Sequence, residues 1–192
     1  MPNKLSKNHK VVFASILILI GILGRTIFHI GDNIEFVTVG TLLAGSYLGG
    51  FWAFFVPLTI MAVSDLFLGN TLIFIFTWSA YLFMALFALA QLRSKNSLVG
   101  KLFKAELVGF FSSIFFFLWT NFGVWALDSF GMYSNDLSGL IASYIMGIPF
   151  LKSNILSNLL FIPLFFVSVE LVFSENSKKA IFRRILPAKK IE

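Results

Sequence analysis

The sequence predicts an all-α, polytopic integral membrane protein with six transmembrane helices, and composition, run length and charge placement lead to this prediction. Of the 192 residues, 58% are hydrophobic and 12% are charged, whereas soluble domains are about half apolar and a quarter charged. The apolar runs do not alternate with polar residues as barrel strands do, so helices are the membrane-spanning structure to expect. The chain contains no cysteine, which excludes disulfides, thiolate metal sites and cysteine nucleophiles.

Six apolar segments follow one another, separated by glycine, proline or polar residues. A basic stretch over residues 1–10 precedes the first apolar run, and a basic tail over residues 174–192 follows the last, leaving a transmembrane domain over residues 11–173. The predicted helices cover residues 11–24 (extending to 30), 36–48, 51–68, 72–92, 107–127 and 150–173. The basic start and first apolar run also resemble a signal peptide, but no small-residue cleavage site follows, so we expect a retained helix.

The connections carry their own signals. Gly49 and Gly50 separate the second helix, which is short for a full span, from the third. Residues 93–104 are expected to form a polar loop, and residues 140–146 are too short to cross a membrane. Pro149 is expected in the first turn of the last helix, where proline is tolerated, while Pro57 and Pro163 fall inside helices.

Charge placement predicts the orientation. With six spans and a cytoplasmic amino terminus, thirteen of the fifteen basic residues lie on the cytoplasmic side, and only Arg25 and Lys152 lie outside. The net charge of +6 is therefore a topology signal, and a nucleic-acid partner is not needed to explain it. We expect a multi-pass protein of the bacterial inner (cytoplasmic) membrane with both termini cytoplasmic.

Polar residues inside the apolar segments are the candidate site residues, because they are costly at membrane depth. Asp65 closes the third segment and could pair with Arg25, cap the next turn or contact a ligand. Asn121 and Trp125, four residues apart, share a helix face that could hold a ligand or form an interhelical contact. Asn154 and Asn158 have the same spacing and must face a pocket or a neighbouring helix.

Motifs for catalysis and metal binding are absent from the sequence. His9 and His29 lie too far apart in sequence for the usual zinc spacing, and no phosphate-binding P-loop is present. We therefore predict no enzyme activity, no metal and no cofactor. An intramembrane Ser–His hydrolase that uses His29 is a distant third class of function. Gly45 and Gly49 form a small-xxx-small pair, which in apolar sequence usually serves packing within the chain.

A family resemblance follows from the order of three patterns: VGTLLAGSYLGGFWAFFVPLTIMAVSDLFLG, then TNFGVW, then GLIASYIMGIPFLKSNILSNLLF. Over about residues 25–166 the chain resembles the substrate-binding S components of energy-coupling factor (ECF) transporters. More narrowly, it resembles the related bacterial membrane protein family DUF6580.

The resemblance implies a six-helix, S-component-like fold whose outer pocket is roofed by residues 29–36, 68–71 and 128–150. It implies a small-molecule substrate, and a partnership with a membrane coupling subunit and two ATPases. The first helix, with Ala14, Ser15, Gly21 and Gly24, lacks the clean small-residue spacing of the S-component docking face. The resemblance also implies a set of substrate-binding residues: Asn33, Glu35, Asp65, Asn121, Trp125, Tyr144, Asn154 and Asn158.

The sequence thus favours a membrane subunit that binds a small vitamin-like or related organic nutrient for uptake, energised by partner ATPases. The alternative is a solitary membrane scaffold or assembly protein with the same fold, which the imperfect docking face and the 17% aromatic content support.

Overall fold

The computed structural model is a bundle of antiparallel helices and describes residues 5–28, 31, 36–69, 71–92, 97–127 and 131–173. Its elements are α1 (Lys7–Thr26), α2 (Val37–Leu43), the π-helical turn η1 (Ala44–Leu48), α3 (Phe51–Leu68), α4 (Phe74–Leu92), α5 (Leu98–Leu127) and α6 (Leu137–Phe173). The described ranges contain helices and no strand, which confirms the all-α prediction. Five of the helices are long and apolar enough to cross a membrane, and Val37–Leu48 is a shorter apolar helix.

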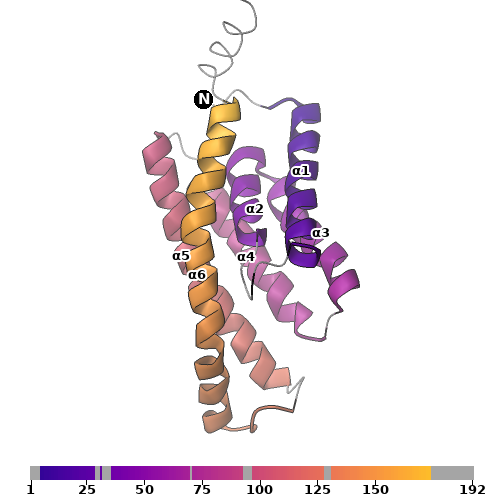
Figure 1. Cartoon of the computed structure of the whole chain (residues 1–192), viewed down its shortest axis with the longest axis vertical. Helices are drawn as coiled ribbons and strands as arrows, with labels where there is room; N and C mark the ends of the chain where they lie inside the picture. Colours follow the sequence, from indigo (N-terminus) through magenta and orange to yellow (C-terminus); the bar gives the residue numbers. More distant parts are fainter. Residues whose placement is uncertain are drawn as a thin grey trace, which may run out of the picture.

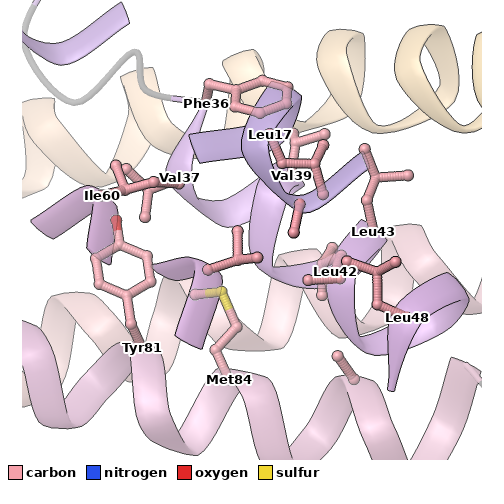
Figure 2. Close-up of a cluster of buried hydrophobic side chains, with 14 of the residues drawn as sticks. Leu17, Phe36, Val37, Val39, Leu42, Leu43, Leu48, Ile60, Tyr81 and Met84 are labelled. Atoms are coloured by element: carbon pink, nitrogen blue, oxygen red, sulfur yellow. The ribbon is translucent and has the colours of Figure 1, made fainter. Parts of the chain in front are cut away.

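The short helix α2 lies at the centre of the bundle. Every residue from Val37 to Leu43 is buried, so α2 has no face for lipid or water. Figure 2 shows its side chains among Leu17 of α1, Ile60 of α3 and Met84 of α4. Burying this many apolar side chains is what stabilises so short a helix, because a helix of this length is marginal alone.

Turn residues define the hairpin from η1 to α3. Gly49 and Gly50 adopt φ values of 65° and 53°, in the left-handed region that favours glycine. The π-helical turn ends with a hydrogen bond from the Gly49 amide to the Ala44 carbonyl. Gly45 lies so close to Ala88 of α4 that an added Cβ would come within 2.5 Å of the alanine side chain. The predicted glycine break and the role of Gly45 in packing within the chain are both confirmed.

The start of α1 and the end of α6 lie at the same end of the molecule. We call this the basal end. There the start of α1 meets the end of α6, with the rings of Phe13 and Phe173 at 5.4 Å. Lys10 of α1 also donates a hydrogen bond to the Leu48 carbonyl at the end of η1. We call the opposite end, where Arg25 of α1 meets Asp65 of α3, the distal end.

The predicted loop over residues 93–104 is wrong from residue 98 onward, because α5 begins at Leu98. Ser97 caps this helix: its hydroxyl accepts from the Gly100 amide, and its carbonyl accepts from the Lys101 amide. Lys101, one of the basic residues that suggest a loop, is tolerated in this helix because it is paired with Glu170 of α6. At the other terminus, α1 begins at Lys7, before the predicted residue 11, because Ser6 caps it.

The last helix is the largest departure from the sequence prediction. Residues 140–146 and Pro149 belong to one continuous helix, α6, so neither a short separate segment nor a start at residue 150 is correct. Gly147 allows α6 to approach Asn121 of α5, and the Ser143 hydroxyl donates to the Asn121 carbonyl. The helix continues through Pro149, two residues after this contact. In Figure 1, α5 and α6 continue past the turn between α3 and α4 at the bottom of the view.

Candidate functional site: a cavity at the distal end

A cavity of about 510 Å³ opens at the distal end of the bundle, where α1 and α3 end and α4 begins. Five helices and the segment before α6 form its wall. The lining residues are Arg25, Met61, Thr77, Tyr81, Phe116, Thr120, Asn121, Val124, Met132, Tyr133, Met146, Gly147 and Phe150. Its volume falls in the range of small-molecule sites, and most of its wall is apolar or aromatic, as in such sites.

Arg25 is the fixed positive group of this wall. Its Nη1 donates to Asp65 Oδ1 at 3.0 Å and to Ser64 Oγ at 2.6 Å, both on α3. The second oxygen of Asp65 accepts from the indole nitrogen of Trp78 on α4, at 2.8 Å. The side chains of Arg25 and Asp65 are only 12% and 9% exposed. One carboxylate therefore ties α1, α3 and α4 together and holds the guanidinium at the cavity.

Thr120 and Asn121 of α5 add hydrogen-bonding atoms to the wall. The Thr120 hydroxyl donates to the Phe116 carbonyl and the Asn121 amide nitrogen to the Phe117 carbonyl, both at 2.8 Å. Both side-chain oxygens can accept a hydrogen bond, and the Asn121 amide nitrogen carries a second N–H. The rings of Tyr81 and Phe116, with centroids 5.4 Å apart, supply an aromatic surface beside them. The arrangement suits a small organic molecule with an apolar body and polar substituents.

The structure brings some of the predicted site residues to the cavity and leaves others away from it. Asn121 lines the cavity, and Asp65 lies directly behind Arg25. The interpretation of Asp65 as a partner of Arg25 is confirmed. Asn33, Glu35 and His29 fall outside the described residues, so their predicted roles stay predictions.

Trp125 and Tyr144 contact protein groups rather than the cavity wall. The Trp125 indole donates to the Ser134 carbonyl at 3.1 Å, and the Tyr144 hydroxyl donates to the Leu118 carbonyl at 3.2 Å. Both bonds hold the α5–α6 hairpin together. The shared helix face of Asn121 and Trp125 therefore serves two purposes, with the asparagine at the cavity and the tryptophan at the connection.

Asn154 and Asn158 lie deeper, in the seam between α5 and α6. The Asn158 amide nitrogen donates to Ser113 Oγ of α5 at 2.9 Å and to Asn154 Oδ1 at 3.1 Å. Asn158 is 2% exposed. Of the two options that the sequence left open for this pair, the contact with a neighbouring helix is the one the structure displays.

The predicted roof over residues 128–150 is wrong in its second half, because residues 137–150 are helical and form a wall of the cavity instead. The segment before α6 does contribute, through Met132 and Tyr133. Asp136 begins the helix by accepting from the Gly139 amide and from the hydroxyls of Ser138 and Ser134. These hydrogen bonds lower the pKa of Asp136 to about 2, so the cap stays charged at neutral pH.

Sequence reasoning missed a second polar cluster, at the basal end. Glu170 of α6 accepts from the Tyr47 hydroxyl at 2.7 Å and from Lys101 Nζ at 3.2 Å. The Lys101 ammonium also lies 4.6 Å from the centre of the Tyr47 ring. The sequence predicts Lys101 within a polar loop (residues 93–104) and Glu170 within the last apolar helix (residues 150–173). Tyr47, in the π-helical turn, is 123 residues from Glu170, so no local pattern joins them.

Comparison with known sequences identifies a family but no characterised relative. No curated protein and no solved structure matches the chain significantly. The sequence profile of a family of unknown function, DUF6580, matches residues 5–181, which is most of the chain, and confirms the narrower of the two resemblances read from the sequence. The chain therefore belongs to the DUF6580 family.

Proposed function

We propose that this protein is the substrate-binding subunit of a membrane uptake system for a small vitamin-like or related organic nutrient. The observation that carries the proposal is the cavity of about 510 Å³ at the distal end, walled by five helices and by the fixed guanidinium of Arg25. A cavity with an apolar wall and a few held polar groups is the usual form of a small-molecule site.

The proposal includes six passes, with α2 and η1 crossing the bundle as a shortened second pass, and an arrangement like that of ECF S components. It places the basal end in the cytoplasm, because the described lysines Lys10 and Lys101 lie at that end, and the cavity at the outer surface. Because the sequence has no P-loop, ATPase partners and a coupling subunit would supply the energy for transport.

Docking to such a coupling subunit through α1 would use mostly large side chains, with Ser15 as a small exposed residue among them. The small residues Ala14 and Gly21 are buried, and an added Cβ on Gly21 would come within 2.5 Å of Ile60 Cδ1. The exposed face of α1 carries Val12, Ile16 and Leu19, at 58%, 48% and 57% exposure. The outward face of α1 therefore presents mainly large apolar side chains instead of the small residues expected of an S-component docking face.

The test is ligand retention by the purified protein. Small molecules released by denaturing the protein are identified by mass spectrometry, and the same compound is then offered to variants. Asn121→Leu places an apolar side chain in the cavity wall and is expected to lower retention at least about tenfold, as the loss of a buried hydrogen bond with steric filling would. Tyr144→Phe, on the flank of the same hairpin, is the control and is expected to retain the compound. Absence of any released compound, or equal retention by Asn121→Leu, would contradict the proposal.

A scaffold or assembly protein is the second candidate function, and the length of α6 favours it. This helix has 37 residues, or about 55 Å, whereas about 20 residues cross a bilayer. Its first turns carry Leu137, Ile141 and Ile145 at 70%, 49% and 58% exposure. An apolar stripe that continues past the turn between α3 and α4 suits a protein partner. Recovery of envelope-synthesis proteins rather than ATPases in a cross-linked pull-down would favour this second function.

A further inference from the structure

A groove of about 440 Å³ runs along the side of the bundle between α4 and α5, away from the distal cavity. Its wall consists of Met84 and Phe87 from α4 and, from α5, apolar side chains that include Leu107, Phe111 and Phe115. Phe87 and Phe111 are 55% and 64% exposed, so the groove is open to the surroundings of the bundle rather than to its ends. In a membrane, such a groove faces the lipid chains.

The charged and amide side chains of this groove lie toward its basal end, and Ser112 is a further polar residue of its wall. Gln91 lies next to the last residue of α4, and Lys104 lies two turns into α5. From Lys104 to Phe115 the helix rises about 16 Å, which accommodates a large part of an acyl chain. The groove thus has a cationic and amide end at the membrane surface and an apolar trough leading toward the middle of the bilayer.

Lys104 is the charged side chain in the wall at this end of the groove. The neighbouring Lys101 of α5 is paired with Glu170 of α6, and the next acidic residue of α5 is Glu106. Basic pockets between helices on the cytoplasmic side are typical binding sites for anionic lipid headgroups. A cation at the head of an apolar trough is complementary to an anionic headgroup at the head of an acyl chain.

A second lateral groove, between α1 and α6, provides an internal comparison. It has a similar volume, about 420 Å³, and is lined by apolar side chains such as Leu23, Leu164 and Phe165. Its wall as described contains no charged or amide side chain. This groove can accept hydrocarbon, but it offers nothing that distinguishes one headgroup from another.

We propose that the α4–α5 groove is a binding site for one anionic phospholipid, with an acyl chain against Leu107 and Phe111 and the headgroup phosphate at Lys104 and Gln91. The site is separate from the distal cavity, and it does not depend on the proposed uptake function. It lies in the leaflet at the basal end.

The experiment is native mass spectrometry of the full chain in detergent, with phosphatidylglycerol and phosphatidylcholine of the same acyl chains. The wild-type protein is expected to retain one phosphatidylglycerol in preference to phosphatidylcholine. Lys104→Gln is expected to reduce this preference about fivefold, the contribution of one basic residue near the membrane surface. Lys152→Gln, the same change on an exposed lysine of α6, is the control and should leave the preference unchanged.

The apolar half of the site has a matched pair of variants. Leu107→Trp fills the α4–α5 groove and should lower retention of both lipids, whereas Leu164→Trp fills the other groove and should not affect phosphatidylglycerol. The proposal would be overturned if the wild-type protein retained the two lipids equally. It would also be overturned if Leu107→Trp left lipid retention unchanged, or if a protein occupied the groove in place of a lipid. If Leu107→Trp fails to fold, Phe111→Ala opens the groove wall at an exposed position and should weaken retention instead.

Discussion

At the scale of single residues, Arg25 and Asp65 form the contact on which the distal end depends. Removing one member of a buried ion pair leaves the other charge without its partner and typically costs about 3–5 kcal/mol, more than the pair itself contributes. Trp78 and Ser64 share the same network, so the effect spreads over three helices.

We therefore expect Asp65→Asn and Arg25→Met each to lower the free energy of unfolding by about 3 kcal/mol. The double variant should be less destabilised than the sum of the two, because neither charge is then left buried alone. Thermal unfolding in detergent, followed by tryptophan fluorescence, measures this. If the destabilisation of the double variant equalled the sum of the two single variants, Arg25 and Asp65 would not act as a unit.

At the scale of elements, close helix contacts depend on glycines whose neighbours differ. On α1, an added Cβ at Gly21 would lie 2.5–2.9 Å from three atoms of Ile60, whereas at Gly24 the nearest atom is Phe36 Cβ at 3.9 Å. Gly21→Ala should therefore destabilise the α1–α3 contact by about 1–3 kcal/mol through overpacking. Gly24→Ala should be neutral or stabilise by up to about 1 kcal/mol, because alanine favours the helix.

The two glycine variants can be compared directly, since they lie on the same helix and undergo the same change. The measurement is the midpoint of thermal unfolding for each purified variant beside the wild-type protein. If Gly21→Ala unfolded at the same temperature as Gly24→Ala, the tight approach of α1 to α3 would be contradicted.

The elements that sequence predicts well are those whose ends are marked locally. Residues 51–68 were predicted correctly because glycines with positive φ flank α3 on both sides. The start of α5 and the course of α6 were not, because distant partners decide them. Lys101 is tolerated in a helix through Glu170, and the part of α6 that contains Pro149 packs on α5 through Gly147 and Asn121. These contacts join residues 26 and 69 positions apart in sequence, which no local pattern reveals.

The candidate site divides in the same way. The ion pair of Asp65 with Arg25 was one of the options that the sequence offered, because an isolated acid and an isolated base at membrane depth usually pair with one another. The contributions of Tyr81, Thr120 and Phe150 could not be read, because apolar helices offer many such residues and only tertiary packing selects those facing the cavity. The polarity of Asn158 made it a candidate for the binding site, but helix packing places it against Ser113 of α5 and not at the cavity.

At the scale of the whole molecule, the geometry makes a prediction about membrane orientation. The start of α1 and the end of α6 meet at the basal end, and α5 begins there as well, through Lys101 and Glu170. Residues before α1 and at the start of α5 should therefore face one side of the membrane, and the connection between α5 and α6 should face the other. From the basic residues of the sequence, we predict that the basal side is cytoplasmic.

Because the chain contains no cysteine, single cysteines can be introduced without a background. Asn8→Cys and Val99→Cys mark the basal end, and Asn135→Cys marks the distal connection; all three positions are exposed. A membrane-impermeant maleimide should label Asn135→Cys in intact cells, and should label the other two only after the membrane is opened. The reverse pattern would invert the orientation and place the cavity on the cytoplasmic side, which an uptake subunit could not use. If Asn8→Cys and Val99→Cys were labelled from opposite sides, the shared basal end would be contradicted. The chain between the two positions would then cross the membrane an odd number of times, so α2 and η1 would not form a crossing between α1 and α3.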